Sequence, residues 1–395
     1  MGLKQLKILV LSFYFKPDLS AGSFRATAFV DALRVKIPIG GQIDVLTTLP
    51  NRYSSFSVEA PAEELSPGLS IVRILLPHHK SGMLDQANSF ISFARAVLRQ
   101  THGKKYDLVF ATSSRLMTAV LGAWIARKNQ TKLYLDIRDI FVDTVRDVFP
   151  RHLAIMTKPL FDLIERRTIN CADKVNLVSK GFAEYFSVRY PRQQFSYYTN
   201  GIDTEFLSAP KPKPIPRISN VIEVIYAGNL GEGQGLHAII PELAKRMHGK
   251  IKFKIIGDGG RKSALRVALE RTAVDNVELL PPMNRAQLID AYQSADVLFL
   301  HLNNYDAFKK VLPSKLFEYG AMGKPIWAGV SGYAADFVRA ELDNSVVFHP
   351  CDVSDAERVF SLLKLHDESR FRFKSKFARK NVVNELAIDV LKLIV

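Results

Sequence analysis

One short segment of the chain combines a helix start with a cation and a carboxylate. Residues 311–326 read VLPSKLFEYGAMGKPI, and Ser314 is well placed as the N-cap of a helix that Gly323 ends. The free amides at a helix N-terminus attract phosphate, and Lys315 adds a positive charge there. Glu318 lies one turn in, where its carboxylate can accept hydrogen bonds from paired sugar hydroxyls. The segment therefore fits a diphosphate joined to a ribose; the alternative is an ordinary capped helix with solvated Lys and Glu.

Two expected strand-to-helix turns contain glycine where a phosphate can approach the backbone. Gly22 follows the first strand, and Arg25 lies in the next helix, where it can pair with phosphate. Residues 228–235 (GNLGEGQG) form a glycine-dense turn that can wrap a phosphate with backbone amides. A dinucleotide fold would require G-x-G-x-x-G at the first turn and an acidic residue ending the second strand. Neither is present, so we exclude an NAD(P)-dependent dehydrogenase.

A further pair of charges, Arg138 and Asp139, follows the expected strand Lys132–Ile137. Ligands of open α/β sheets bind beyond the carboxyl ends of the strands, so charged residues there favour a functional role. The alternative is an Arg–Asp ion pair that holds the next loop. We expect Asp139 to be the more important of the two.

The composition of the chain limits the protein classes that fit. A length of 395 residues with 47% apolar residues is typical of two domains, each with its own core. Cys171 and Cys351 lie far apart, and His78-His79 have no carboxylate or Cys at ligand spacing, which argues against a disulfide framework and a zinc site. The N-terminal apolar run predicts a buried strand rather than a signal peptide, and no run approaches the ~20 apolar residues of a transmembrane helix.

The net charge of +15 is distributed unevenly along the chain. Residues 1–200 contain 27 Lys/Arg and 16 Asp/Glu, whereas residues 201–395 contain 27 and 23. The basic first half indicates an anionic partner, either membrane headgroups, a phosphorylated lipid or nucleic acid. The alternative is that the surplus charge only aids solubility. Because no nucleic-acid-binding module is recognisable, we rank nucleic acid below membrane.

Strands and helices alternate twice along the chain, which predicts two doubly wound parallel sheets. In the first half the expected strands are Lys7–Phe15, Gln42–Thr48, Ser70–Leu76, Asp107–Thr112, Lys132–Ile137 and Lys174–Ser179, with helices Phe24–Val35, Asp85–Arg99, Leu116–Ala126 and Leu153–Ile169. In the second half they are Ile222–Tyr226, Lys252–Ile256, Val277–Leu279, Val297–Leu300 and Ile326–Ala328, with helices Leu236–Met247, Lys262–Thr272, Arg285–Ser294 and Lys315–Ala321.

Six segments, in order, resemble the family 4 retaining glycosyltransferases of the GT-B fold. They are Ala21–Ser23, Asn200–Asp203, Tyr226–Gly231, Ile256–Gly260, Ala291–Val297 and Pro313–Tyr319. The resemblance extends from about residue 7 to about residue 350 and is densest after Asn200. It implies an α/β chain of two facing Rossmann-like domains: 1–205 for the acceptor, a Pro-rich linker at 206–217, and 218–375 for a nucleotide-sugar. It also implies that the last helix, about 376–395, completes the first domain.

The resemblance places the donor nucleotide against residues of both halves. These are Gly22, Arg25, Gly228, Asn229, Gly231, Gln234, Gly257, Gly259, Arg261, Met283, Val311, Leu312, Lys315 and Glu318. The family commonly has Arg and Lys, both contacting the diphosphate, where this chain has Asn229 and Gln234. Their charge must come from Lys309, Lys310, Lys315 or Arg261, and which one supplies it stays open.

Two further departures concern catalysis. Where the family often has a first Glu eight residues before the second, this chain has Lys310, which suggests a subgroup in which this lysine meets the donor phosphate or sugar. Where the family often has a His-Asp pair, it has Arg138-Asp139. The catalytic candidates are therefore Asp139, Arg138, Lys310 and Glu318, and whether Arg138 or Asp139 is essential stays open. The resemblance implies no metal and no other cofactor.

The resemblance is strongest to bacterial enzymes of surface polysaccharide (O-antigen, capsule) synthesis. It implies transfer, with retention, of a hexose-type sugar, plausibly an N-acetylhexosamine, from a UDP-sugar to a lipid-diphosphate-linked saccharide. The expected location is cytoplasmic, at the inner face of the plasma membrane, with Lys80, Arg95, Arg99, Lys104 and Lys105 near the acceptor and the anionic membrane. For their helix, a plain core role is the alternative. The competing functions are a nucleotide-sugar epimerase of the same fold and a non-catalytic membrane or nucleic-acid binding protein.

Overall fold

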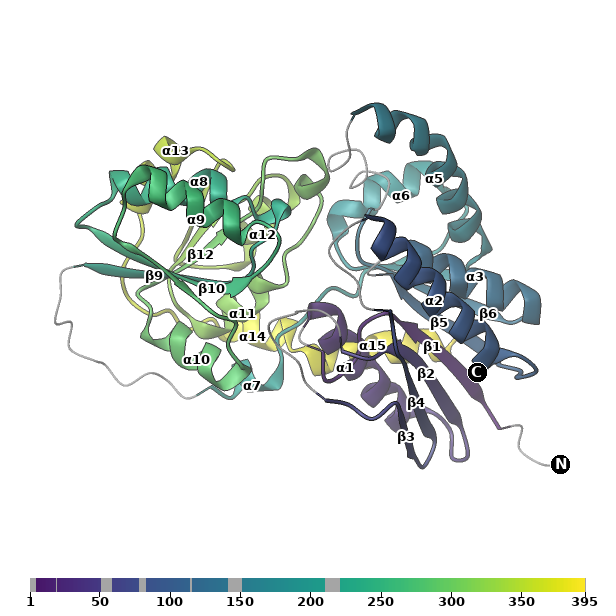
Figure 1. The fold of residues 1–395 in the computed structure, drawn as a ribbon. Coiled ribbons are helices and arrows are strands. Elements are labelled where there is room, and N and C mark those ends of the chain that lie inside the picture. The colour runs from purple at the N-terminus through teal and green to yellow at the C-terminus, as the bar shows by residue number, and fades with distance from the viewer. Residues whose placement is uncertain are drawn as a thin grey trace. The chain divides into compact units, whose positions relative to one another are not determined.

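A computed structural model describes residues 5–18, 20–50, 59–77, 83–113, 116–140, 151–209 and 221–394, without the side chains of 83–86 and 151–157. The chain divides into two compact units. The first unit comprises residues 1–200 and 379–395, and the second comprises residues 201–378. Each is an α/β unit around its own sheet (Figure 1).

The first unit contains an eight-stranded sheet in the order β3-β4-β2-β1-β5-β6-β7-β8. All neighbours are parallel except β3 and β4, which form an antiparallel edge pair. The strands are β1 (Lys7–Ser12), β2 (Gln42–Thr48), β3 (Glu63–Ser66), β4 (Leu69–Ile74), β5 (Leu108–Ser113), β6 (Lys132–Ile137), β7 (Lys174–Leu177) and β8 (Phe195–Ser196). Continuous apolar runs such as that of β1 suit a central strand that is buried on both faces.

Helices connect these strands, and one helix returns from the end of the chain. The helices are α1 (Ala21–Lys36), α2 (Met83–Thr101), α3 (Leu116–Asn129), α5 (Arg151–Cys171), α6 (Ala183–Arg189) and α15 (Arg379–Leu391). Helix α15 packs beside α1, with Val383, Leu386 and Val390 in the same apolar cluster as Phe29 (Figure 1). The C-terminal helix therefore completes the core of the first unit.

The second unit contains a six-stranded parallel sheet in the order β11-β10-β9-β12-β13-β14. Its strands are β9 (Ile222–Asn229), β10 (Ile251–Asp258), β11 (Val277–Leu280), β12 (Val297–His301), β13 (Ile326–Gly329) and β14 (Ser345–Phe348). The chain runs outward in one direction from β9 and in the opposite direction from β12, and these two strands are neighbours. Their carboxyl ends therefore form the topological switch point, where open α/β sheets bind ligands.

Helices cover both faces of the second sheet (Figure 1). Helices α8 (Leu236–Arg246), α9 (Lys262–Thr272) and α13 (Val353–Phe360) pack on one face. The other face is covered by α7 (Thr204–Leu207), α10 (Arg285–Ser294), α11 (Lys315–Met322), α12 (Tyr333–Glu341) and α14 (Phe371–Phe377).

The predicted fold class, two doubly wound parallel sheets, is confirmed. The edge strand β3 was not predicted, because its short alternating pattern resembles a polar loop. Residues 201–205 were expected in the first domain, yet they belong to the second unit, since Ile202 and the neighbouring Phe206 lie in its apolar core. Of the expected linker 206–217, residues 206 and 207 end α7, and 210–217 lie outside the described residues.

Candidate functional site

The glycine-dense turn leaves β9 at the switch point of the second sheet. Gly228 has a backbone φ of +142°, a region that L side chains rarely adopt. A Cβ atom on Gly228 would lie 2.2 Å from Lys315 Nζ. Gly257, at the end of β10, has a φ of +147°, and a Cβ there would lie 1.9 Å from the carbonyl oxygen of Gly228. The absent side chains thus let two strand ends and one lysine converge at the sheet edge.

Lys315 is oriented by an aromatic ring and by the glycine. Its ammonium lies 5.1 Å from the ring centroid of Tyr226, a cation–π distance. The Tyr226 hydroxyl donates to the carbonyl oxygen of Asn229 at 2.7 Å, so one side chain contacts both the lysine and the turn. Lys315 is half-buried in the first turn of α11. The lysine therefore places a positive charge against the glycine-dense turn.

At two positions of the turn, this chain has uncharged amide side chains where the resembled family has Arg and Lys. Asn229 Nδ2 donates to Gln234 Oε1 at 2.8 Å, and the amide of Gly231 donates to the same oxygen at 3.3 Å. Gln234 ends the short 3-10 helix η2 (Glu232–Gln234). These residues, predicted for donor binding, are brought together as a hydrogen-bonded amide pair. Gly259 closes the same corner, because a Cβ there would lie 2.7 Å from the backbone of Leu230.

Two of the other candidate cations, Arg261 and Lys309, have carboxylate partners. Arg261 forms a short contact with Glu232, whose pKa is lowered by the hydroxyl of Tyr305 and by the arginine. Lys309 pairs with Asp306 at 2.7 Å in the 3-10 helix η3 (Asp306–Lys309). Lys310 is half-buried at the end of η3. Arg261 thus contacts the glycine-dense turn through the carboxylate of Glu232, whereas the ammonium of Lys315 lies against Gly228.

Helix α11 differs from expectation at its start. Ser314 occupies the N-cap position, but its backbone is helical (φ −60°, ψ −27°) and its side chain makes no capping bond, so the predicted hydroxyl cap is wrong. Gly323 ends the helix in the left-handed conformation, with φ +76°. The hydroxyl of Tyr292 lies 3.4 Å from Glu318 Oε2. Burial, then the nearby Tyr319 and Glu318, raise the pKa of Tyr292, which keeps it a hydrogen-bond donor toward the carboxylate.

Three apolar residues predicted for nucleotide binding lie on the α10–α11 side of the sheet. Leu312 is buried in that core and Met283 is half-buried against it, so their side chains are used for packing. Val311 is half-buried, and its amide donates to the carbonyl oxygen of Phe308 at 3.4 Å.

In the first unit, Gly22 and Arg138 lie in contact. A Cβ on Gly22 would lie 2.1 Å from Arg138 Nη1, so the glycine makes room for the guanidinium at the start of α1. Arg138 Nε is buried without a hydrogen-bond partner. Burial lowers the pKa of Arg138, as do Arg25 and Arg379, whereas Asp139 and Asp136 raise it. The carboxyl end of β6 therefore holds an arginine cluster, with Asp139 exposed beside it.

Arg25 has a different role from the one predicted. It is 1% exposed, and its Nε and Nη2 donate to the two carboxylate oxygens of Asp136 at 2.9 and 2.8 Å. Its Nη2 also donates to the carbonyl oxygen of Tyr198 at 2.8 Å, and its Nη1 to that of Thr199 at 2.6 Å. With its donors used in the core, Arg25 does not reach a phosphate, and the prediction that it binds the donor is wrong.

The basic residues predicted near the acceptor lie on α2 and the turn after it. Arg95, Arg99, Lys104 and Lys105 are all exposed, whereas Phe93 and Val97 of the same helix are buried. One face of the helix thus packs into the core, and another face exposes cations to solvent. Lys80 lies outside the described residues.

Sequence reasoning missed His301 and Asn303, which contact the glycine-dense turn. Asn303 N donates to the carbonyl oxygen of Gly233 at 2.8 Å, and His301 Nδ1 lies 2.7 Å from that of Gln234. A signal was present, because His301 ends the buried strand β12 and Asn303 follows two residues later. Such residues at a switch point are candidates for function.

Two features are absent from the described ranges. No group of three His, Cys, Asp or Glu side chains suited to a metal ion occurs among them. No helix within the part of the chain that the structure describes is long and apolar enough to cross a membrane. The expectation that no metal is required stays a prediction.

Comparison with known proteins identifies both halves. Residues 40–197 match the family described as Glycosyl transferase 4-like domain, and residues 210–380 match Glycosyl transferases group 1. The chain is 23% identical over 341 residues to WcaI, a protein of Escherichia coli K12 named as a colanic acid biosynthesis glycosyl transferase. The alignment covers 80% of this chain and 82% of that protein.

Solved structures share the architecture of the whole chain. Sucrose-phosphate synthase from Thermosynechococcus elongatus aligns with a TM-score of 0.74 at 14% identity, covering 98% of this chain and 99% of that one. Anabaena Alr3699/HepE, solved in complex with UDP-glucose, aligns with a TM-score of 0.67 at 15% identity, covering 98% and 100%. The architecture is that of the GT-B glycosyltransferases, and with both family matches the chain belongs to the glycosyl transferases of group 1 with a 4-like N-terminal domain.

Proposed function

We propose that this glycosyltransferase moves a hexose-type sugar, with retention, from a UDP-sugar to a lipid-diphosphate-linked saccharide in surface polysaccharide synthesis. The relative WcaI is named for colanic acid biosynthesis, which supports the pathway class. The structural relative Alr3699/HepE was solved with UDP-glucose, which supports the donor class. The positions of Lys315, Glu318 and the exposed cations of α2 are the further observations that support the proposal.

The observation that carries the proposal is the position of Lys315. Its ammonium lies against Gly228 at the switch point of the second sheet, beside the amide pair Asn229–Gln234. A diphosphate placed on the glycine-dense turn would meet backbone amides and the Lys315 ammonium, which together offset part of its negative charge. Glu318, with Tyr292 near its Oε2, is one turn further along the same helix, where it suits the ribose hydroxyls. We propose Lys315 as the cation that replaces the family's missing Arg and Lys.

The leaving diphosphate needs its developing charge stabilised, and we propose that protein cations and helix amides do this without a metal. Within the first unit, the guanidinium of Arg138 packs on Gly22 at the N-terminus of the 16-residue helix α1, so that unit has a cation and helix amides of its own. Ser20 caps that helix by accepting from the amide of Ser23 at 3.1 Å. Asp139 and Lys310 remain candidates for a catalytic role.

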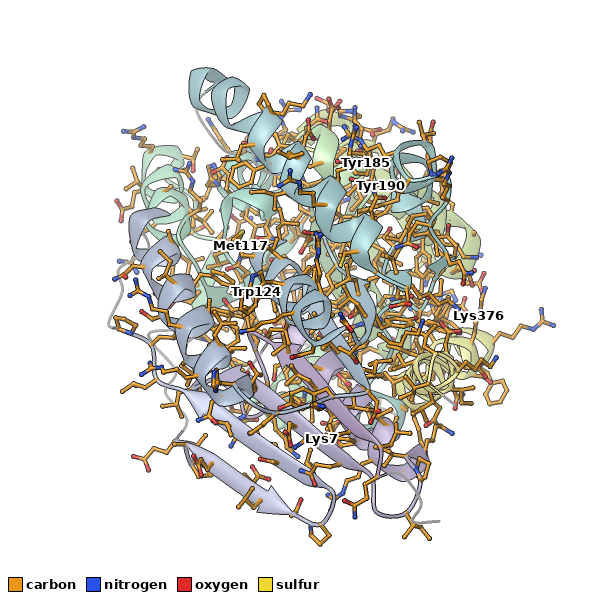
Figure 2. The ribbon with its side chains drawn as sticks, turned by 90° about the vertical axis from the view of Figure 1, so that its right-hand side faces the viewer. Lys7, Met117, Trp124, Tyr185, Tyr190 and Lys376 are labelled. Carbon is orange, nitrogen blue, oxygen red and sulfur yellow. The ribbon has the colours of Figure 1, made fainter. Side chains whose placement is uncertain are left out.

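The acceptor side of the proposal rests on charge. Besides the exposed cations of α2, Lys128 of α3 lies 5.0 Å from the ring of Trp124, which is 49% exposed and labelled in Figure 2. Both line a groove of about 470 Å³ that includes Arg99 and His102. An exposed tryptophan beside cations suits a headgroup layer, because its ring enters the interface while lysine and arginine meet phosphate. We propose that this face of the first unit meets an anionic membrane.

A donor screen tests the function. The full chain is incubated with UDP-, GDP- and ADP-sugars, with and without a lipid-diphosphate-linked saccharide, and release of nucleoside diphosphate is measured. The proposal expects release from a UDP-sugar that rises with acceptor and yields a glycosylated lipid of retained anomeric configuration. An epimerised nucleotide-sugar without any glycosylated lipid would refute it.

A further inference from the structure

The carbonyl groups of the glycine-dense turn are held by the segment that leaves β12. Asn303 Nδ2 donates to the carbonyl oxygen of Glu232 at 3.1 Å, and Asn303 N donates to that of Gly233 at 2.8 Å. His301 Nδ1 lies 2.7 Å from the carbonyl oxygen of Gln234. Three successive carbonyls of η2 are thus bound from β12, the neighbour of β9 at the switch point. The turn takes its shape from that strand.

His301 is held in one protonation state. Its Nε2 accepts from the amide of Cys351 at 2.9 Å, so the proton must be on Nδ1, which donates to Gln234. The side chain is fully buried, with its ring stacked on Phe299 and Phe348 at centroid distances of 6.3 and 5.9 Å. Burial lowers the pKa of His301 to about 4, so the ring is neutral at physiological pH.

The bond from His301 extends through Gln234 into the turn. The backbone carbonyl of Gln234 is held by the histidine, and its side-chain oxygen accepts from Asn229 Nδ2 and from the amide of Gly231. A shift of the Gln234 backbone away from His301 would carry this side chain with it and weaken the bonds from both donors. The histidine therefore controls the amide pair that replaces the charged residues of the resembled family.

We propose that His301 is a positioning residue, which through Gln234 fixes residues 229–235 in the conformation that receives the donor's diphosphate. The inference rests on the proposed function, since it names what holds the donor-binding turn. A turn that is ordered before binding loses less conformational freedom when the nucleotide arrives, so affinity depends on what orders it. Without His301 the turn would be ordered only on binding, and nucleotide affinity would fall.

Three substitutions in the full chain separate the two hydrogen bonds of His301. His301→Phe keeps a ring in contact with Phe299 and Phe348 and loses both bonds. His301→Asn puts an amide nitrogen near the position of Nδ1 and keeps the donor to Gln234. His301→Gln puts an amide oxygen near the position of Nε2 and keeps the acceptor for Cys351.

The readout is the Kd for UDP, with GDP and ADP in parallel, measured by titration calorimetry, beside the midpoint of thermal unfolding. We expect the Kd to rise about tenfold or more in His301→Phe and His301→Gln, the loss of one well-placed hydrogen bond to the turn. The Kd of His301→Asn should stay within about threefold of the wild-type value, even if His301→Asn and His301→Gln unfold at the same temperature.

Asn276→Leu is the matched control for lost stability. Asn276 is buried at the opposite end of the same sheet, where its Nδ2 donates to the carbonyl oxygens of Ala244 and Ile251 at 2.9 and 3.1 Å. This variant should unfold at a lower temperature and bind the nucleotide as wild type does. If His301→Phe binds UDP like wild type, or if affinity follows the unfolding midpoint in all four variants, the inference is overturned. Wild-type protein that binds no nucleotide would instead refute the proposed function, and the inference with it.

Discussion

Replacing Arg25 by methionine tests whether this arginine is a structural ion pair or a phosphate ligand. The side chains of Arg25 and Asp136 are 2% and 1% exposed and form a bidentate pair. In Arg25→Met, Asp136 would keep the hydrogen bonds from Thr112 and Asn176 at 2.9 and 2.8 Å, but it would be a buried anion without its cation. Breaking a buried pair from one side typically costs about 3–5 kcal/mol. Against a usual total stability of about 5–15 kcal/mol, that loss is large.

The assay is denaturant unfolding followed by circular dichroism at pH 7, with UDP affinity measured on the folded variant. Arg34→Met is the control, because Arg34 lies exposed on the same helix and donates to the carbonyl oxygen of Pro67. We expect Arg25→Met to lose about 3–5 kcal/mol and Arg34→Met less than about 1 kcal/mol. Adding Asp136→Asn to Arg25→Met should recover part of the loss, since the buried charge is then removed. UDP affinity of the folded fraction should stay near wild type in all of them.

The same variant has a defined pH dependence. Burial acts to raise the pKa of Asp136, but the charge and hydrogen bonds of Arg25 outweigh it and hold the pKa below its ordinary value. In wild type this stabilisation is present above about pH 4 and is lost as pH falls through the lower folded pKa. Without Arg25 burial dominates and the pKa rises, so the deficit of the variant should shrink as the pH is lowered. If Arg25→Met is as stable as Arg34→Met but no longer binds UDP, the structural role is refuted, and Arg25 is a phosphate ligand instead.

Three further predictions follow from the two units. Burial lowers the pKa of His301 to about 4, so the contribution of the neutral ring to stability is present above about pH 6.5 and is lost as the pH falls toward 4. The loss should reach about 3 kcal/mol. The free energy of unfolding, measured against pH, should show this slope in wild type but not in His301→Asn. UDP at about 100 times its Kd should add about 2.7 kcal/mol to stability with a chelator present, and loss of that gain in the chelator would contradict metal-free binding. Replacing Lys80, Arg95, Arg99, Lys104 and Lys105 by glutamine should weaken binding to anionic vesicles by about 1 kcal/mol for each residue in contact, and should leave UDP affinity unchanged. Equal vesicle binding by that variant and by a control with Lys245, Lys250, Lys252, Arg266 and Arg271 replaced would rule out the membrane face.

The sequence was sufficient for the fold because the determining patterns are local. Apolar runs of strand length alternate with helical periods, and each such run became a strand of one of the two sheets. Gly228 and Lys315 could also be predicted at one sheet edge, since one lies near the end of a strand and the other begins a helix there. What could not be predicted was that the Lys315 ammonium occupies the space that a Cβ atom at position 228 would need.

Two of the errors have a common physical cause, which is pairing between residues far apart in the sequence. Arg25 resembles a phosphate ligand in its own turn, and its partner Asp136 is 111 residues away. His301 was missed because its two contacts, Gln234 and Cys351, are 67 and 50 residues away. Ser314 shows a local limit instead, since a suitable residue type caps a helix only when its backbone is extended, and here the backbone is helical.

The account depends most directly on the charge that Lys315 places against Gly228. Titration of UDP into wild type, Lys315→Met and Lys309→Met measures it, because methionine keeps the packed stem and removes only the charge. Lys309 is the control, an exposed lysine nearby in sequence that pairs with Asp306. One lost charge-assisted hydrogen bond is worth about 1.5–3 kcal/mol, so we predict that Lys315→Met raises the Kd by about ten- to a hundredfold while Lys309→Met leaves it unchanged. Wild-type affinity in a folded Lys315→Met protein would contradict the proposed donor site.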